Sequence, residues 1–564
     1  MPLPFRLSAA VLFVACAASA AGCRPPPRRM DAALPEDVPG PLRTLAFGGD
    51  VMLARRMHVG VTDDDASGPL APIRDLLASA DVALVNLECV LSARGEMQDK
   101  GERNSFYYRG RPDLVRILVE GGIDVVTLGN NHSGDYGPEA IEDAPAILDA
   151  AAVQRVGAGR DAAEASAPAF RTVGDVNVAF IGADATQESF AVRPGRAGVN
   201  HLSERDPEAF VAAVRSQVAV ARRRAHVVFL TIHWGPNNAD EPAPERVRLA
   251  KRLIDAGADA VLGHSAHRTQ GIEIHRGRPI LYDAGNLLWD YDDDGPSHQG
   301  IVFRLHFDRA GVRWIEAIPV RLRENRTETA GPQDAEAALS RLERLSRAMG
   351  TEVARRAADG GAGAGTGIVG YVVIRDGPRP RPPADGSAFP PVPAPRTPPA
   401  DVLFPTPAAV VPDLPAGAVR FDPPVGLEHG IEMLGYLVET PRIRRHRPLV
   451  VTTWWRATRP VDARFQVFLH VEGTRSGQAR FAGTGAGDHE PGDWSYPTNR
   501  WRPGEIVADR FNVRPYPDVP PGTYAPYVGM WHESRGNRLR VLDPARHDGS
   551  HRMPLGTFEQ TAEP

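Results

Sequence analysis

The chain has 564 residues, a net charge of −5 and a hydrophobic content of 42%. This length exceeds one ordinary hydrophobic core, so two or more domains are expected. The charge balance shows no basic excess that would indicate nucleic acid as a partner, and no internal stretch reaches the roughly 18 apolar residues of a membrane span.

The N-terminus has the composition of an export signal. A positive side chain precedes an alanine-rich apolar segment that runs from Leu7 to about Ala21, and Gly22-Cys23 follows. This order of charge, apolar run and small residues is typical of a signal peptide. The ending resembles a bacterial lipobox, which implies that Cys23 is acylated and anchors the exported chain to a membrane of the cell envelope or periplasm. The alternative is an ordinary secretory signal with an incidental cysteine.

Residues 24–41 are rich in proline and arginine and predict a tether between membrane and fold. Cleavage would leave Cys23 and Cys89, so acylation of Cys23 excludes a disulfide within the mature chain. Cys89 could be a soft metal ligand, but we favour a small buried hydrophobe at a strand end.

From residue 42 to about 376, apolar strands alternate with helical patterns, which indicates a layered α/β domain. Strands are predicted at Thr44–Phe47, Val82–Val85, Val125–Leu128, Val176–Ile181, Val227–Ile232, Ala260–Leu262, Ile280–Tyr282, Val302–Phe307, Trp314–Arg321 and Ile368–Ile374. Helices are predicted at Asp113–Glu120, Pro138–Ala151, Asp206–Arg223, Ala243–Ala256 and Asp334–Ala358.

The remainder of the chain has a different pattern. Residues 377–418 are dominated by proline, which predicts an extended spacer. Residues 419–555 contain short alternating runs separated by Gly, Pro and Asp, which predicts an antiparallel β-sandwich. Its strands are predicted at Met433–Val438, Leu449–Arg456, Arg464–Val471, Ile506–Val513, Thr523–Trp531 and Leu539–Val541.

Five polar segments of metal-ligand type lie directly after predicted strands of the α/β domain. They are Gly48–Met52, Asn86–Glu88, Gly129–Asp135, Ile232–Gly235 and Gly263–His267. Because open α/β sheets build their sites at the carboxyl ends of strands, these segments are expected to converge.

A two-metal hydrolase needs carboxylates that can bridge, and imidazoles or an amide that complete each metal shell. Its two cations share a water molecule, lower the pKa of that water and neutralise charge on the attacked phosphoryl group. The segments supply such a set. The candidate ligands are Asp50, Glu88, Asn131, His233, His264 and His267.

Four further residues are candidates for the chemistry. His132 could reach the substrate as a general acid or charge stabiliser, oriented by Asp135. Arg55 could bind an anionic substrate group through its forked guanidinium, although a surface salt bridge explains it equally well. Trp234 is predicted to form a wall of the substrate pocket.

The same segments resemble the CapA, or poly-γ-glutamate capsule synthesis, family of the calcineurin-like metallophosphoesterase superfamily. The resemblance covers residues 43–305 and rests on Gly49-Asp50-Val51-Met52-Leu53-x-Arg55, Asn86-Leu87-Glu88, Asn130-Asn131-His132-x-x-Asp135-Tyr136-Gly137, His233-Trp234-Gly235, Gly263-His264-x-x-His267 and Tyr282-Asp283-Ala284-Gly285-Asn286. It implies a four-layer αββα metallophosphoesterase-like fold with one or two divalent ions: manganese, iron or zinc.

Two departures from the superfamily pattern are expected to matter. Met52 stands where the general pattern has a histidine after Asp-x, a loss that CapA proteins share, so one metal would be held more weakly or be absent. Ser265 and Ala266 replace the middle of a His-His-Pro-His run, but the two ligand positions remain.

The C-terminal residues resemble, less strongly, a β-sandwich module found on bacterial envelope glycosyltransferases. The resemblance rests on Leu434-Gly435-Tyr436, Val467–Val471, Tyr496–Glu505 and Pro521-Gly522-Thr523-Tyr524. Trp454, Trp494 and Trp501 could stack on sugar rings, so carbohydrate or protein is a candidate partner. We favour the alternative that these aromatics belong to the core.

The leading hypothesis is an exported, metal-dependent phosphoesterase of the cell envelope. It would act on an envelope polymer or a phosphorylated small molecule and be linked to capsule or surface-polymer synthesis. The second hypothesis is non-catalytic binding, transport or anchoring of an anionic polymer such as poly-γ-glutamate, which the loss of a histidine at Met52 favours. A 5′-nucleotidase-like scavenging enzyme ranks third.

Overall fold

The computed structural model describes residues 42–55, 57, 68–100, 106–290, 298–323, 325–357, 368–374, 409–444, 447–475 and, with short gaps, 481–562. The predicted signal peptide, Cys23, the tether and most of the proline-rich spacer lie outside these residues. Among the helices within them, none combines the length and apolar character of a membrane span.

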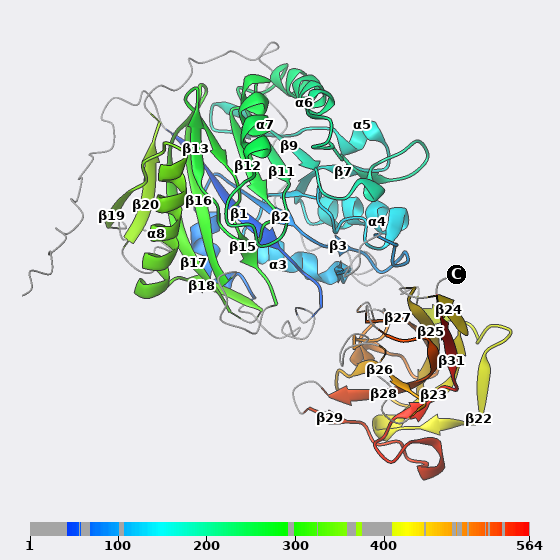
Figure 1. Ribbon diagram of the computed structural model, residues 1–564. Helices are drawn as coiled ribbons and strands as arrows, with labels where there is room; N and C mark the ends of the chain where they lie inside the picture. Colours follow the sequence, from blue (N-terminus) through cyan, green and yellow to red (C-terminus); the bar gives the residue numbers. More distant parts are fainter. Residues whose placement is uncertain are drawn as a thin grey trace, which may run out of the picture.

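The N-terminal region is an α/β domain built on two large sheets (Figure 1). One sheet has ten strands: β1 (Arg43–Val51), β2 (Val82–Leu87), β5 (Val125–Thr127), β6 (Gln154–Val156), β15 (Asn286–Leu288), β16 (Gln299–Asp308), β17 (Gly311–Arg323), β18 (Arg326–Thr329), β19 (Ala354–Ala357) and β20 (Ile368–Val373). The other has six: β8 (Ala169–Val173), β9 (Val176–Asp184), β11 (Val227–His233), β12 (Ala260–His264), β13 (Ile272–His275) and β14 (Arg278–Leu281).

The larger sheet is parallel in the half that ends at β6 and antiparallel in the other half, whereas the smaller sheet has a parallel centre and an antiparallel strand at each edge. In the larger sheet β1, β2, β5 and β6 pair in parallel, and β16 and β17 continue the sheet in antiparallel pairing. In the smaller sheet β9, β11, β12 and β14 pair in parallel. The central strands are buried along their whole length, as expected for parallel strands covered on both faces.

The four longest helices of the α/β domain each have a proline near their first residue. The helices α4 (Gly137–Ala150), α6 (Pro207–Arg222), α7 (Pro244–Asp255) and α8 (Pro332–Ala348) each carry proline in the first turn, where its missing N–H costs nothing. The shorter helices are α2 (Arg74–Ala78), α3 (Val115–Glu120) and α5 (Ala162–Ala165).

The predicted helix Asp334–Ala358 is wrong in its last ten residues. It ends at Ala348, Gly350 adopts a positive φ of 80°, and the chain then enters β19, which pairs with β20. Strand pairing overrides the helical propensity of this alanine- and arginine-rich stretch.

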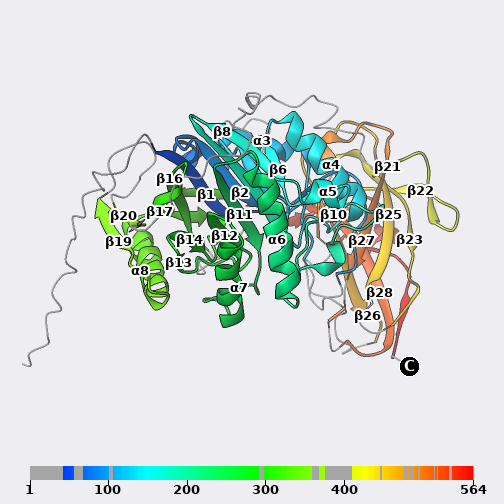
Figure 2. The same ribbon diagram turned by 90° about the horizontal axis from the view of Figure 1, so that it is seen from above.

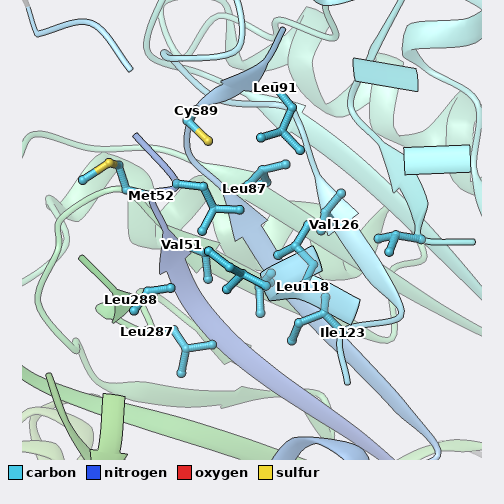
Figure 3. Close-up of a cluster of buried hydrophobic side chains, with 14 of the residues drawn as sticks. Val51, Met52, Leu87, Cys89, Leu91, Leu118, Ile123, Val126, Leu287 and Leu288 are labelled. Atoms are coloured by element: carbon cyan, nitrogen blue, oxygen red, sulfur yellow. The ribbon is translucent and has the colours of Figure 1, made fainter. Parts of the chain in front are cut away.

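Buried apolar side chains of the α/β domain form three clusters. One joins the larger sheet to α2, α3 and α4, and Figure 3 shows part of it. A second contains residues of both sheets, among them Phe229 and Phe307, whose ring centroids are 5.5 Å apart. A third joins the smaller sheet to α6 and α7. Cys89 lies in the first cluster, and burial raises the pKa of its thiol to about 12, so the packing interpretation is confirmed.

The C-terminal β region, residues 409–562, has two further sheets. One contains β21 (Val410–Val411), β22 (Val419–Gly426), β23 (Ile431–Val438), β25 (Leu449–Ala457) and β27 (Ile506–Val513). The other contains β24 (Arg442–Arg444), β26 (Gln466–Gly473), β28 (Gly522–His532), β29 (Asn537–Arg538), β30 (Met553–Pro554) and β31 (Phe558–Thr561). One buried cluster draws residues from both sheets.

Several sequence predictions for this region need correction. Strand β21 lies within the predicted spacer and pairs with β27, and β31 extends past residue 555. The predicted strand Leu539–Val541 is replaced by β29, two residues earlier. Trp454 and Trp501 are each 3% exposed, so the core interpretation holds for these two aromatics.

The C-terminal β region lies beside the α/β domain, at the end away from α8 (Figures 1 and 2). Ion pairs join it to one part of that domain, residues 92–100 and 106–113, which we call the bridging segment. The pairs are Glu96–Arg510 at 3.2 Å, Asp99–Arg447 at 3.3 Å, Asp113–Arg500 at 3.2 Å and Arg111–Glu490 at 3.8 Å.

The inner part of this interface is buried. The side chains of Arg111 and Glu490 are 4% and 1% exposed, Arg111 also pairs with Asp113 at 3.0 Å, and Glu490 pairs with Arg464 at 2.6 Å. Because buried charges are costly when unpaired, these four residues hold one another in place across the two regions.

Glu490→Gln tests the buried pairing. Removing this charge leaves Arg111 and Arg464 without their shared carboxylate, so we expect the free energy of unfolding of the full chain to fall by about 3 kcal/mol. Urea unfolding followed by fluorescence measures it. Glu559→Gln is the control, because Glu559 and its partner Arg442 have side chains that are 57% and 76% exposed. We expect this substitution to change the free energy of unfolding by no more than about 0.5 kcal/mol. Equal effects of the two substitutions would contradict the role of the interface.

Candidate metal centre

Strand register brings the predicted segments together at the carboxyl ends of both sheets. On β1, Asp50 lies opposite Asn86 of β2 and Asn286 of β15. On β11, His233 lies opposite His264 of β12. Parallel strands therefore place their last residues side by side, as the sequence predicted.

The two sheets meet through these residues. Asp50 Oδ2 is 3.1 Å from Nδ1 of His267, in the loop after β12, and Asn86 Nδ2 is 3.3 Å from His233 Nδ1. The Nδ1 atoms of His233 and His264 are 2.8 Å apart. The site thus lies where the carboxyl ends of the two sheets face each other.

Five of the six predicted ligands fall into two groups that could hold a metal ion. One group is Asp50, His233 and His264, and the other is Asp50, Glu88 and His267; within each, the ligand atoms lie within 4.8 Å of one another. All five side chains are buried. Asp50 belongs to both groups, so its carboxylate is placed to bridge.

Two buried oxygens without hydrogen-bond donors indicate that these residues fit a cation. Glu88 Oε1 and Asn131 Oδ1 have no hydrogen-bond donor. Glu88 Oε1 is 3.9 Å from Nε2 of each of His132, His233 and His267. Since zinc ligands lie about 2.1 Å from the ion, two of them can be up to about 4.2 Å apart, so these spacings fit shared cations. A cation would also satisfy oxygens that are costly to bury unpaired.

Burial controls the charge of the two carboxylates. It raises the pKa of Glu88 well above its ordinary value, and the charge of Asp50 adds to the effect. Burial also acts on Asp50, but the hydrogen bond and charge of His267, with the charges of His264 and His233, hold that pKa below its ordinary value. A divalent cation would favour the ionised form of both groups.

The imidazoles are mostly held neutral, which metal ligation requires. Burial lowers the pKa of His264 to about 4 and that of His233 well below its ordinary value. His267 is the exception: burial acts against its charge, but the hydrogen bond to Asp50 raises its pKa.

The turn that carries His264 and His267 needs glycine at Gly263. A Cβ there would lie 2.0 Å from the carbonyl oxygen of Tyr282, so no other residue fits. Ser265 and His267 both have positive φ, of 118° and 57°. This strained turn aims both imidazoles at the same centre, and strain of this kind is frequent at functional sites.

His132 and Asp135 are in direct contact, with Nδ1 and Oδ2 2.7 Å apart. Burial lowers the pKa of His132 to about 4, the charge of Asp135 opposes this shift, and the charge of Lys100 adds to it. Lys100 Nζ lies 2.7 Å from the other oxygen of Asp135. Sequence reasoning missed Lys100, because it stands in a polar stretch with no strand end or motif to mark it.

Comparisons with known proteins identify the family of this chain. Residues 44–291 match the family model described as bacterial capsule synthesis protein PGA_cap. A probable polyglutamine synthesis accessory protein of Mycobacterium tuberculosis is 35% identical over 291 residues, which cover 49% of this chain and 76% of that protein. The chain belongs to the CapA family.

More distant relatives include the capsule biosynthesis protein CapA of Bacillus anthracis, 25% identical over 50% of this chain and 68% of the relative. The PGA biosynthesis protein CapA of Bacillus subtilis is 24% identical over 50% of this chain and 71% of the relative. Among solved structures, a β-glucosidase from Listeria innocua aligns over 64% of this chain and 39% of that chain, at 10% identity and a TM-score of 0.14, too low to indicate a common fold.

In this CapA-family chain, Met52 packs in the apolar core. Its side chain is fully buried in the cluster that joins the larger sheet to α2, α3 and α4, where Figure 3 labels it. Its Sδ accepts a hydrogen bond from Ala54 N at 3.1 Å. The position that holds a histidine in the general superfamily pattern is therefore part of the apolar core.

Two predicted substrate contacts have different outcomes. Arg55 lies close to the centre: its guanidinium is 5.8 Å from the ring of Tyr108, which packs at 4.1 Å against His132. It is 39% exposed and pairs with buried Asp290. Trp234, predicted to form a wall of the substrate pocket, is 2% exposed. It is buried among side chains of α7 and the smaller sheet and donates from Nε1 to the carbonyl oxygen of Tyr282.

Three polar residues support the ligands and received no role from the sequence. Asn86 donates to Asp50 Oδ1 at 2.8 Å, and Asn286 Oδ1 is 3.0 Å from His267 Nδ1. Asp283 accepts from the backbone N–H groups of Ala266 and Gly285, which fixes the histidine turn. All three lie inside the segments that carry the family resemblance, so the sequence marked them as part of those segments but did not reveal their contacts.

Substitution of the ligands tests the assignment. His264→Ala and Glu88→Ala each remove one ligand of a proposed ion, so we expect manganese affinity to fall by at least about 100-fold. Isothermal titration with Mn²⁺ and metal analysis after dialysis measure the loss.

His275→Ala is the matched control. This histidine lies on β13 and pairs with Asp255 away from the centre, so its removal should leave metal binding unchanged. Wild-type metal content in Glu88→Ala would show that the carboxylate is not a ligand.

Proposed function

We propose that this chain is a metal-dependent phosphoesterase that acts in the cell envelope on a phosphoryl ester of a surface polymer or of a phosphorylated small molecule. One observation carries the proposal: two buried ligand groups share Asp50, and the buried oxygen Glu88 Oε1 of one group has no hydrogen-bond donor. Catalytic cations would satisfy both ligand groups, and Asn131 Oδ1 is a further buried oxygen without a donor.

The mixed donor set indicates the class of metal. Imidazole and carboxylate ligands suit manganese, iron or zinc better than calcium or magnesium, which prefer oxygen. When bound, such ions would supply Lewis acidity towards a phosphoryl oxygen and lower the pKa of a water molecule. The residues that would hold them are Asp50, Glu88, Asn131, His233, His264 and His267.

The remaining groups supply positioning and proton handling. Arg55 would bind a non-reacting anionic oxygen, because its guanidinium lies near Tyr108 at the exposed side of the centre. His132 would hold or move a proton at Nε2, the ring nitrogen that lies 3.9 Å from Glu88. The ring of Tyr108 packs on His132 and excludes water from it.

The wider context supports an envelope role. The three buried clusters support the four-layer αββα arrangement of metallophosphoesterases. The names of the Bacillus relatives refer to capsule and PGA biosynthesis, and we extend a part in surface-polymer synthesis to this chain. The predicted signal peptide and acylated Cys23 would place it in the periplasm or envelope as a lipoprotein.

A second function is polymer handling without hydrolysis. The observation that favours it is Met52, whose burial in the core removes one imidazole from the pattern of the superfamily. In that case the centre would bind or order an anionic polymer such as poly-γ-glutamate.

Hydrolysis of bis(p-nitrophenyl) phosphate and p-nitrophenyl phosphate, with Mn²⁺ added to the chain from residue 24 onward, separates the two functions. We expect turnover by the wild type and a loss of about 10²–10⁴-fold in kcat for His132→Ala, with metal content unchanged. His275→Ala should retain full activity.

Bound metal without turnover would contradict the esterase. Binding of poly-γ-glutamate that His132→Ala leaves intact would then favour the polymer-handling function.

A further inference from the structure

Lys100 is a buried cation beside the proposed metal centre. Its side chain is 1% exposed, and its Nζ lies 2.7 Å from Asp135 Oδ1, 3.1 Å from the carbonyl oxygen of Phe106 and 3.3 Å from His132 Nδ1. Buried lysines are rare because the charge loses its hydration, so this one must be fixed by its partners. With Asp135 Oδ1 and the carbonyl oxygen of Phe106 beside it and almost no exposed surface, the ammonium has no room to contact substrate.

The contacts of Asp135 determine the hydrogen-bonding state of His132. Its Oδ2 is 2.7 Å from His132 Nδ1 and accepts the backbone N–H of Tyr108, also at 2.7 Å. An oxygen and a nitrogen this close need a proton between them, so we assign Nδ1 as the donor to Asp135 Oδ2. The neutral ring then has its free lone pair on Nε2, which faces Glu88.

We propose that Lys100 is a positioning residue that acts through Asp135. Through its ion pair with Oδ1, it balances the charge of the carboxylate and holds the group in place, so that Oδ2 holds His132 with Nε2 directed at the proposed metal centre. The inference rests on the proposed function, because orienting Nε2 matters only if a reaction occurs at that centre. Lys100, Asp135 and His132 then form one chain of contacts that ends at the proposed metal ligands.

The backbone around Lys100 supports this role. Gln187 Nε2 donates to the carbonyl oxygen of Lys100 at 3.1 Å, and the N–H of Gln98 donates to the carbonyl oxygen of Asp135 at 2.8 Å. The two residues of the ion pair are thus held by their main chains as well as by their side chains, as a positioning contact requires.

A double-mutant cycle with Lys100→Met and Asp135→Asn tests the chain of contacts, using bis(p-nitrophenyl) phosphate and Mn²⁺ with the chain from residue 24 onward. We expect Lys100→Met to lower kcat by about 10–100-fold, with KM within about threefold and metal content unchanged. The double variant should be no slower than Asp135→Asn alone, because Lys100 acts only through that carboxylate. Effects that multiply would overturn the proposal.

A second measurement does not depend on turnover. Nitrogen-15 spectra of histidine-labelled protein should show His132 of the wild type as one tautomer, with the proton on Nδ1. In Lys100→Met this signal should broaden or split as the ring loses its fixed orientation. An unchanged His132 signal in a folded variant would overturn the positioning role even if no phosphoester is hydrolysed, whereas a changed signal without turnover would count against the esterase alone.

Lys251→Met is the matched control for both measurements. Lys251 also pairs with a carboxylate at 2.7 Å, that of Glu273, but it is partly exposed and lies on α7 away from the centre. Circular dichroism and thermal unfolding of each variant establish that it is folded.

Discussion

Two carboxylates buried side by side are the constraint on which the α/β domain depends. Asp50 and Glu88 lie at or just past the ends of neighbouring strands, and both side chains are buried. A buried carboxyl group must be protonated, paired with a positive charge or bound to a cation. Together with the imidazoles of His233, His264 and His267, the two carboxylates form two groups that could hold a metal ion. The strand register and the glycine turn both serve to keep these groups at one point.

The centre is also asymmetric. On the side of the smaller sheet three histidines are available, whereas on the side of β1 the position of a further histidine is taken by Met52, which packs in the core. His132 is not one of the proposed ligands. Its Nδ1 contacts Asp135 and Lys100 instead. This chain thus keeps buried residues that could hold a metal ion, while the side chain of Met52 contributes to packing.

The sequence predicted what depends on periodicity and strand ends. The strands of the α/β domain and the convergence of Asp50, Glu88 and the histidines follow from apolar runs that end in polar residues. Lys100 could not be found this way, because its role depends on a contact with Asp135, 35 positions later. The burial of Trp234 was missed for a related reason: it follows His233, the last residue of β11, and packs with side chains of α7 and the smaller sheet that are distant in sequence. The helix predicted to Ala358 failed because a long-range strand pairing overrides local propensity.

The bridging segment has two sets of partners. On one side Lys100 and Tyr108 pack against the residues of the centre, and on the other Arg111 and Asp113 pair with the C-terminal β region. A substitution in the bridging segment must therefore be compatible both with the contacts to the centre and with the ion pairs to the C-terminal β region. In evolutionary terms the two regions are not freely exchangeable modules: grafting a different C-terminal β region onto this α/β domain would require matching changes in the bridging segment, so the two regions are expected to have diverged together.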